Sequence, residues 1–219
     1  MSHRNLFFES LFYGLACLLR FMRIEAIWTN LEPPERSGKP TLWLANHMSF
    51  WDGFVLRWLI QDYDPSRDLC FVVSAKEWSR NLWFRKINTL PIDPRSPRSV
   101  RNIFSFIARF DGDTVFFPQG KIWPSTRRPL GFKRGIEVLL RHLPKDEGIR
   151  LIPVGLHLEP MNRSRSQIFA RVGTPIQINK QEFYNVSKIE MEVESLVNQI
   201  LNDLHGLGET IGPNWKKLK

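Results

Sequence analysis

The sequence predicts an α/β fold, with a mixed, largely parallel central sheet flanked by helices. Short apolar runs typical of buried strands alternate along the chain with longer segments whose apolar residues recur at helical spacing. Turn-forming residues separate these runs, most clearly in residues 31–40, which hold three prolines and a glycine. The 219 residues are enough for one domain with a full hydrophobic core.

The first predicted element is a helix over Asn5–Ile27, rich in Leu, Phe and Met with interspersed charged residues. A helix with such a wide apolar face either lies in a lipid interface or packs on the protein's own core. Arg20 and Arg23, near its end, suit anionic headgroups and suit the helix dipole equally well. Residues 1–30 are therefore predicted to form an N-terminal amphipathic segment, which lies either in a lipid interface or on the protein's own core.

Residues 31–205 are predicted to form the main domain, and residues 206–219 a basic C-terminal tail. The predicted strands, each a short apolar run, are Thr41–Ala45, Leu69–Ser74, Thr114–Phe117, Leu151–Leu158 and Ile168–Val172. Residues 90–95 are expected to be extended because residues before proline avoid the α region. The predicted helices are Phe54–Ile60, Lys76–Ile87, Ser99–Phe110, Gly131–His142 and Ser187–Leu204. Ser187 is expected to cap the last helix, with Glu190 at its third position.

The composition favours an anionic partner. The formal net charge is +9 and the pI is about 9.9, which suits nucleic acid, an acidic membrane surface or phosphorylated substrates. The basic residues are scattered through loops without a nucleic-acid motif, so nucleic acid is not a predicted partner. The 8 Trp and 16 Phe suit a membrane interface, and no apolar run reaches the roughly 18–20 residues of a spanning helix. We expect a cytoplasmic protein, peripheral on the inner face of the membrane.

The stretch Ala45–Phe54 places a histidine and a carboxylate at a predicted strand-to-helix junction, where loops position reactive groups on a rigid scaffold. If His47 lies in the loop and Asp52 in the first helical turn, Asp52 can accept the Nδ1–H of His47 and leave Nε2 free to take a proton. The alternative is structural: Ser49 and Asp52 form a capping box, and His47 is an incidental turn residue.

Three further stretches follow this one in a characteristic order. Lys76 precedes the run Leu90–Arg95, and Phe117–Gly120 and Leu151–Gly155 come later in the chain. Together with the segment from His47 to Asp52, they resemble the four sequence blocks of the glycerolipid acyltransferases, typified by 1-acylglycerol-3-phosphate acyltransferase. The resemblance spans roughly residues 41–175.

The resemblance implies acyl transfer from a thioester, either acyl-CoA or acyl carrier protein, to a hydroxyl of a lysophospholipid or glycerol-phosphate-type acceptor. His47 would remove the proton of the attacking hydroxyl, and Asp52 would orient His47 and stabilise its imidazolium form. This chemistry needs no cofactor beyond the acyl donor and no metal, and no second His or Cys stands at zinc-ligand spacing. The implied partners are the acyl donor, the lipid acceptor and a peripheral membrane surface.

In the family, the second block supplies an arginine for the acceptor's phosphate, usually directly after the aspartate. Here a proline separates Asp93 from Arg95, and Arg95 is the best match. An arginine fork suits phosphate oxygens, although a solvated basic loop would explain the same residues. Lys76 matches a lysine common upstream of that block and is a second candidate for binding phosphate.

The third block departs from the family, which has a glutamate between proline and glycine, followed by Thr-Arg. This chain has Gln119, Gly120, Lys121, Ile122 and Trp123. Glutamine keeps hydrogen-bonding capacity but loses the negative charge. Gly120 permits a tight turn, and Lys121 keeps the region basic. Gln119, Gly120 and Lys121 complete the set of predicted substrate-binding residues.

This departure leaves the acceptor open. Gln119 and Trp123 motivate a second hypothesis, in which the same chemistry serves a non-phosphate acceptor such as a glycosylated lipid or pigment. A third hypothesis, from another class, is a catalytically silent, membrane-associated lipid-binding protein. The presence of both His47 and Asp52 argues against it, because a silent protein has no need of that pair.

Overall fold

The computed structural model describes residues 14, 24–30, 39–133, 135, 137, 149–160, 165–178, 186–205 and 215–218. Within these residues, nine strands form one sheet in the order β4-β3-β5-β2-β6-β7-β1-β9, with β8 paired to β6. The strands are β1 (Ile24–Asn30), β2 (Thr41–Ala45), β3 (Leu69–Ser74), β4 (Thr89–Ile92), β5 (Asp113–Phe116), β6 (Ile149–Glu159), β7 (Ser166–Val172), β8 (Ile176–Ile178) and β9 (Trp215–Lys217). The predicted fold class is confirmed.

One part of the sheet is entirely parallel. β3 runs parallel to β4 and β5, and β2 runs parallel to β5 and β6. The rest is mixed, because β7 is antiparallel to β6 and parallel to β1, while β8 and β9 are antiparallel to their neighbours. The carboxyl ends of parallel strands meet at one edge, where α/β proteins gather their ligands. The segments that follow β2, β3, β4 and β5 therefore leave the sheet at the same edge.

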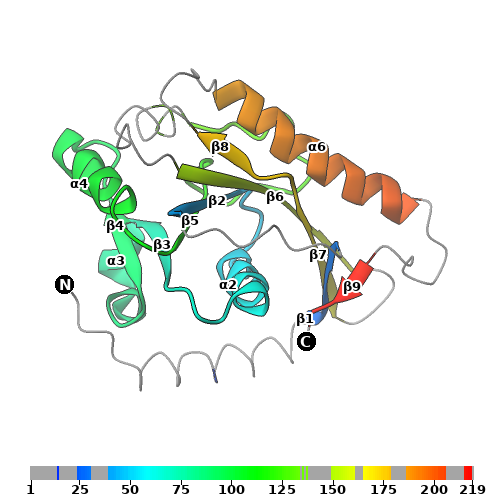
Figure 1. Ribbon diagram of the computed structural model, residues 1–219. Helices are drawn as coiled ribbons and strands as arrows, with labels where there is room; N and C mark the ends of the chain where they lie inside the picture. The colour runs from blue at the N-terminus through cyan, green and yellow to red at the C-terminus, as the bar shows by residue number, and fades with distance from the viewer. Residues whose placement is uncertain are drawn as a thin grey trace.

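Helices cover both faces of this sheet (Figure 1). They are α2 (Asp52–Tyr63), α3 (Ala75–Arg80), the 3-10 helix η1 (Leu82–Arg85), α4 (Pro97–Ile107) and α6 (Val186–His205). Alternate side chains of β2 face opposite layers: Leu42 and Leu44 pack in the cluster of α4 and α6, whereas Trp43 and Ala45 pack in the cluster of α2. No helix among the described residues is long and apolar enough to cross a membrane.

The N-terminal segment differs from the prediction. The predicted helix over Asn5–Ile27 is wrong at its end, because Ile24–Asn30 is strand β1, paired with β7 and β9. Ile24 and Ile27 are buried there, and β-branched side chains suit a covered, pleated surface. The rest of that helix, and of the predicted amphipathic segment 1–30, lies outside the described residues apart from the helical Gly14.

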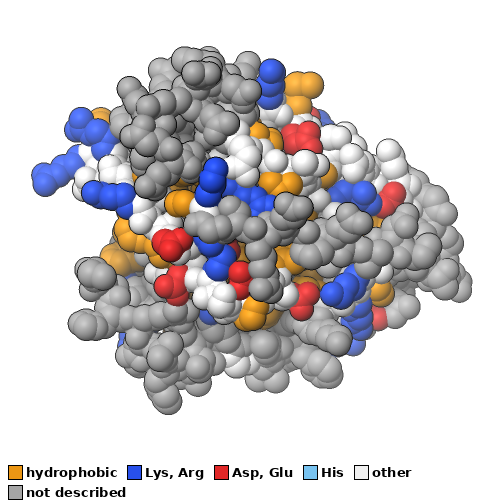
Figure 2. Space-filling view, viewed as in Figure 1, with side chains coloured by type: hydrophobic (Ala, Val, Ile, Leu, Met, Phe, Trp, Pro, Cys, Tyr) orange, Lys and Arg blue, Asp and Glu red, His pale blue; other side chains and the backbone are white. Residues whose placement is uncertain are grey.

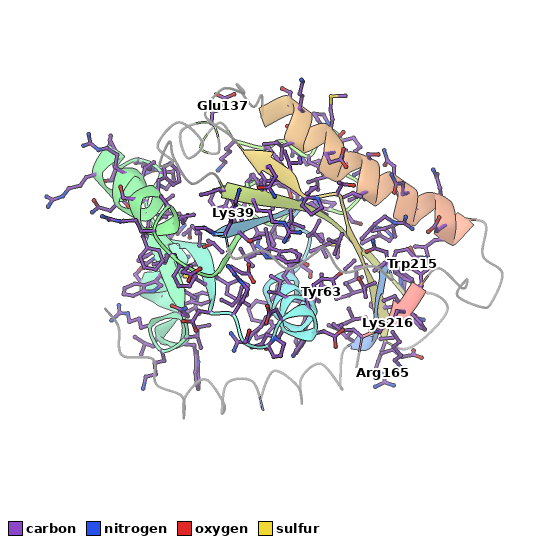
Figure 3. All side chains as sticks on the ribbon, in the orientation of Figure 1. Lys39, Tyr63, Glu137, Arg165, Trp215 and Lys216 are labelled. Atoms are coloured by element: carbon purple, nitrogen blue, oxygen red, sulfur yellow. The ribbon has the colours of Figure 1, made fainter. Side chains whose placement is uncertain are left out.

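The predicted basic tail, residues 206–219, is wrong where Trp215–Lys217 forms β9. Trp215 is buried and packs edge-on against Phe169 of β7, with ring centroids 5.3 Å apart. The guanidinium carbon of Arg171 lies 5.1 Å from the indole centroid. Figure 3 shows Trp215 and Lys216 on this edge strand. One large buried aromatic thus anchors a basic segment in the sheet.

All five predicted helices differ in extent from the observed elements, and in two of them, Phe54–Ile60 and Ser99–Phe110, only the end residues change. The predicted helix Lys76–Ile87 is divided into α3 and η1, because Asn81 has φ −112° and ψ 97°. Gly131 has φ 77° and is not helical, so the helix predicted to begin there does not start at that residue, and most of it lies outside the described residues. α6 begins one residue before Ser187, and the Glu190 carboxylate accepts a hydrogen bond from the Gly131 N–H instead of closing a capping box.

Candidate active site

His47 and Asp52 lie together at the carboxyl edge of the sheet, between β2 and α2. β2 is completely buried, and the chain turns after it into α2, which begins at Asp52. His47 Nδ1 is 2.8 Å from Asp52 Oδ2. The Asp52 side chain is fully buried, whereas 21% of the His47 side chain is exposed. The carboxylate is therefore inside the protein, and the imidazole is reachable from outside.

Asp52 accepts four hydrogen bonds, of which His47 provides one. The backbone N–H groups of Met48 and Ser49 donate to Oδ2 over 2.6 and 2.9 Å, and the Ser49 hydroxyl donates to Oδ1 over 2.6 Å. The same carboxylate thus closes the turn before α2 and holds His47, although Asp52 is the first helical residue and not the third, which a capping box with Ser49 as N-cap would require. Because a carboxylate only accepts, Nδ1 carries the proton and Nε2 is the basic nitrogen.

Asn46 ties this turn to the neighbouring strand β6. It is 1% exposed, and its side chain donates to the Leu156 carbonyl over 2.9 Å and accepts from the Leu156 N–H over 2.7 Å. These bonds extend the pairing of β2 with β6 beyond Ala45 and Val154. Asn46 was not among the predicted site residues; its signal in the sequence is a polar residue that directly follows a fully apolar strand.

The segment after β5 holds His47 from the other side. The His47 N–H donates to Gln119 Oε1 over 2.5 Å, and the His47 carbonyl accepts from the Trp123 N–H over 2.9 Å. The imidazole stacks on Phe117, with centroids 4.3 Å apart and 20° between the planes. Both backbone polar groups of His47 are therefore bonded, and Asp52 and Phe117 together fix the orientation of its ring.

Gln119 is only 2% exposed, and its amide Nε2 donates to the Leu130 carbonyl over 2.7 Å. Both ends of the amide thus bond groups of the protein, so the structure does not place Gln119 where it was predicted to contact substrate. Gly120 has φ 67°, as the predicted tight turn requires. A Cβ at Gly120 would lie 2.9 Å from Lys133 Nζ.

Two cations lie on the indole of Trp123, next to His47. Lys121 Nζ is 3.8 Å and the Arg127 guanidinium carbon 3.6 Å from the ring centroid. Such contacts hold a cation in place while leaving its hydrogen-bonding groups available. Ile122, which stands where the family has an arginine, is 50% exposed. The predicted residue Lys121 is therefore at the site, and Arg127 joins it.

Lys76 and Arg95 follow β3 and β4 and are exposed. Arg95 lies in the turn before α4, where its N–H donates to Asp93 Oδ1 over 3.0 Å. Figure 2 shows Lys and Arg side chains over α4, the helix that follows this turn. β3 and β5 lie between β4 and β2, so at about 4.8 Å per strand the ends of β4 and β2 are about 14 Å apart. Arg95 thus shares the edge with His47 without adjoining it.

The described cysteine, Cys70, lies buried in β3. Burial raises its pKa to about 12, so the thiol stays protonated at neutral pH and is a poor nucleophile. No group of three His, Cys, Asp or Glu side chains in the described part of the chain could hold a metal ion.

The structure thus places a histidine, in contact with a buried carboxylate, at the carboxyl edge of a largely parallel sheet, where α/β proteins gather their ligands. The model of the acyltransferase family matches residues 27–157, which is more than half of the chain. The chain therefore belongs to the acyltransferase family and is an O-acyltransferase, and the predicted glycerolipid acyltransferase resemblance is confirmed.

One solved structure shows the same fold across nearly the whole chain. It is the crystal structure of PlsC, the 1-acyl-sn-glycerophosphate acyltransferase from Thermotoga maritima, with a TM-score of 0.62 and 16% sequence identity. The match covers 94% of this chain and 82% of that chain. No curated protein matches the chain.

Proposed function

We propose that this enzyme moves a fatty acyl group from acyl-CoA or acyl carrier protein to a hydroxyl of a lysophospholipid or glycerol-phosphate-type acceptor, with His47 as general base. The 2.8 Å contact between His47 Nδ1 and Asp52 Oδ2 carries this proposal. It leaves Nε2 of a partly exposed ring to take a proton. PlsC, which has the same fold, is a 1-acyl-sn-glycerophosphate acyltransferase, and this supports a phosphorylated acceptor.

In the proposed reaction, the acceptor oxygen attacks the thioester carbonyl carbon while its proton moves to His47 Nε2. The tetrahedral intermediate then collapses as the C–S bond breaks. The imidazolium gives its proton to the departing thiolate, so that the products are an ester and a free thiol. Asp52 stabilises the imidazolium between these steps. General-base catalysis contributes about 10²–10⁴-fold, and holding both substrates together adds to it.

The cations at the carboxyl edge support an anionic acceptor. Lys121 and Arg127 lie on the indole of Trp123, whose backbone N–H donates to the His47 carbonyl. Arg95 and Lys76 are exposed farther along the same edge. Arg95 and Lys76 are proposed to bind phosphate as the family's second block does, with Lys121 contributing from the third block.

A second acceptor class has an observation in its favour. The family's arginine is replaced by the half-exposed Ile122, and the glutamine that replaces the glutamate is buried and bonded within the protein. Both positions therefore lack a charge that the family carries, and the half-exposed Ile122 presents an apolar side chain to an acceptor. They favour the same chemistry on a non-phosphate acceptor, such as a glycosylated lipid or pigment.

The proposed place of action is the cytoplasmic membrane surface. Phe50 lies three residues after His47, and Ile122 directly precedes Trp123, whose N–H donates to the His47 carbonyl. Phe50 is 65% exposed and Ile122 is 50% exposed. Exposed apolar side chains of this kind enter a lipid interface. Changing both to serine should weaken cosedimentation with anionic vesicles. Met191→Ser on α6, where the native residue is 67% exposed, is the matched control and should leave it unchanged.

The deciding experiment measures thiol release from acyl-CoA and from acyl carrier protein over a panel of acceptors. The panel holds lysophosphatidate, glycerol 3-phosphate, neutral lysophospholipids and a glycolipid, each with wild type and His47→Ala. His47-dependent release with phosphorylated acceptors supports the first acceptor class, and release only with neutral or sugar-bearing ones supports the second. Near-normal turnover of His47→Ala would refute the base. No release with any acceptor would favour a silent lipid-binding protein.

A further inference from the structure

The bridge made by Gln119 connects His47 to a distant helix. Gln119 Oε1 accepts from the His47 N–H over 2.5 Å, and Nε2 donates to the Leu130 carbonyl over 2.7 Å. The Leu130 N–H in turn donates to Glu194 Oε1 of α6 over 2.6 Å, and the Gly131 N–H donates to Glu190 one turn earlier on that helix. A continuous series of hydrogen bonds thus runs from α6 to the backbone of His47.

The chemistry of this bridge requires an amide. The His47 N–H needs an acceptor and therefore faces the amide oxygen of Gln119. The Leu130 carbonyl needs a donor and therefore faces the amide nitrogen, so the oxygen and nitrogen cannot be exchanged. An ionised glutamate could still accept from His47. It would, however, set a second negative oxygen against the Leu130 carbonyl in a position that is 2% exposed. A buried pair of acceptors without a proton between them is unfavourable.

We propose that Gln119 is a positioning residue for His47, and that α6 sets its place through Glu194 and the Leu130–Gly131 segment. This rests on the proposed role of His47 as general base. The glutamine that departs from the family pattern is, in this chain, the residue that joins the turn after β2 to the segment after β5. Its contribution is the placement of Nε2 relative to the two substrates and not their binding.

The first test measures kcat of Gln119→Glu, Gln119→Leu and wild type over pH 5.5–8.5 and compares the ratio of variant to wild-type kcat at each pH. Misplacing a catalytic group by about 1 Å lowers the rate by up to about 10²-fold. We therefore expect kcat of both variants to be about 10–100-fold below wild type at high pH, with KM for either substrate within about twofold. Protonation restores the donor of a glutamate, so the Gln119→Glu ratio should rise as the pH falls. The Gln119→Leu ratio should stay flat. Gln199→Glu, on the exposed face of α6, is the matched control.

The second test measures the protection of the His47 N–H by its hydrogen bond to Gln119. The exchange rate of the His47 amide hydrogen should rise at least about tenfold in Gln119→Leu, while the amide of Leu156, bonded to Asn46, keeps its rate. A Gln119→Glu ratio that does not change with pH, together with unchanged exchange at His47, would overturn the positioning role. Active His47→Ala would instead defeat the proposed base and leave the exchange result standing.

The far anchor provides a test that leaves Gln119 intact. Glu194→Ala removes the acceptor for the Leu130 N–H and should lower kcat about three- to tenfold with KM unchanged. Glu194→Gln keeps an acceptor oxygen and should restore most of the activity. Glu192→Ala, on the same helix, is the control for the loss of a carboxylate. Equal kcat for Glu194→Ala and Glu192→Ala would show that α6 does not set the position of His47.

Discussion

Two buried carboxylates lie at opposite ends of the adjacent parallel strands β2 and β5. Asp52 follows the carboxyl end of β2 and accepts four hydrogen bonds, including one from His47. Asp113 begins β5, opposite Thr41, and its ion-pair partner Arg67 places Nε 3.5 Å from Oδ1. Both are almost completely buried. Burial alone therefore does not distinguish the two carboxylates, whereas the donors around them do: Asp52 accepts from His47, and Asp113 pairs with Arg67.

Neutralising each carboxylate in turn tests whether the two edges differ in function. Asp52→Asn replaces an acceptor of four hydrogen bonds with a group that also donates, so Nδ1–H of His47 loses its fixed partner. We expect kcat to fall about 10²–10⁴-fold, the range of general-base catalysis. Asp113→Asn should leave kcat within about twofold. Steady-state thiol release measures both, and equal losses would show that the two edges do not differ in function.

The sequence predicts the carboxylate contact at one of these edges and not at the other. The apolar pattern predicts the strand before His47 and the helix that holds Asp52. His47 and Asp52 are five positions apart across the turn between these elements, and this spacing predicts their contact. Arg67 and Asp113 gave no such signal, because their contact joins a loop to a strand that begins far along the chain.

The rest of the site depends on contacts between distant segments. Gln119 was predicted at the site from its block, but its burial was not, because its partners His47 and Leu130 lie 72 and 11 residues away. The contact of Glu194 with Leu130 spans 64 residues. Periodicity describes one element at a time, so it cannot show which loop a polar side chain will reach. The short edge strand β9 was missed for the same reason.

A second test separates stability from activity at the edge of Asp113. Arg67→Leu removes the cation next to a buried carboxylate, and breaking a buried pair on one side costs about 3 kcal/mol. We expect the free energy of unfolding to fall by about that amount in urea titrations while kcat at 20 °C stays near wild type. Adding Asp113→Asn should recover most of the loss. No recovery in the double variant would mean that Arg67 acts through another contact.

The pH dependence of stability follows from the same residue. Burial raises the pKa of Asp113 above its ordinary 3.8, although the Arg67 guanidinium lowers it. The folded state therefore binds a proton that the unfolded state has already lost, and this contribution to stability falls as the pH rises from 3.8 through the folded pKa. Asp113→Asn removes it, so the stability of the variant relative to wild type should rise over that interval. Urea unfolding at successive pH values measures the difference, and a constant difference would contradict the shift.

The smallest expected effect concerns a contact of His47 that is not a hydrogen bond. Phe117 stacks on the imidazole with centroids 4.3 Å apart, whereas Phe106 of α4 stacks on Phe110, which follows that helix, with centroids 5.2 Å apart. A stacked aromatic pair contributes about 0.5–1.5 kcal/mol, which corresponds to about two- to tenfold in rate when it is lost from a positioned base. Phe117→Leu should therefore lower kcat by about that factor, and Phe106→Leu should not change it. If both variants keep full kcat, the hydrogen bonds that Asp52 accepts from the ring of His47 and Gln119 accepts from its backbone are enough to position His47, and stacking on Phe117 contributes nothing to the rate.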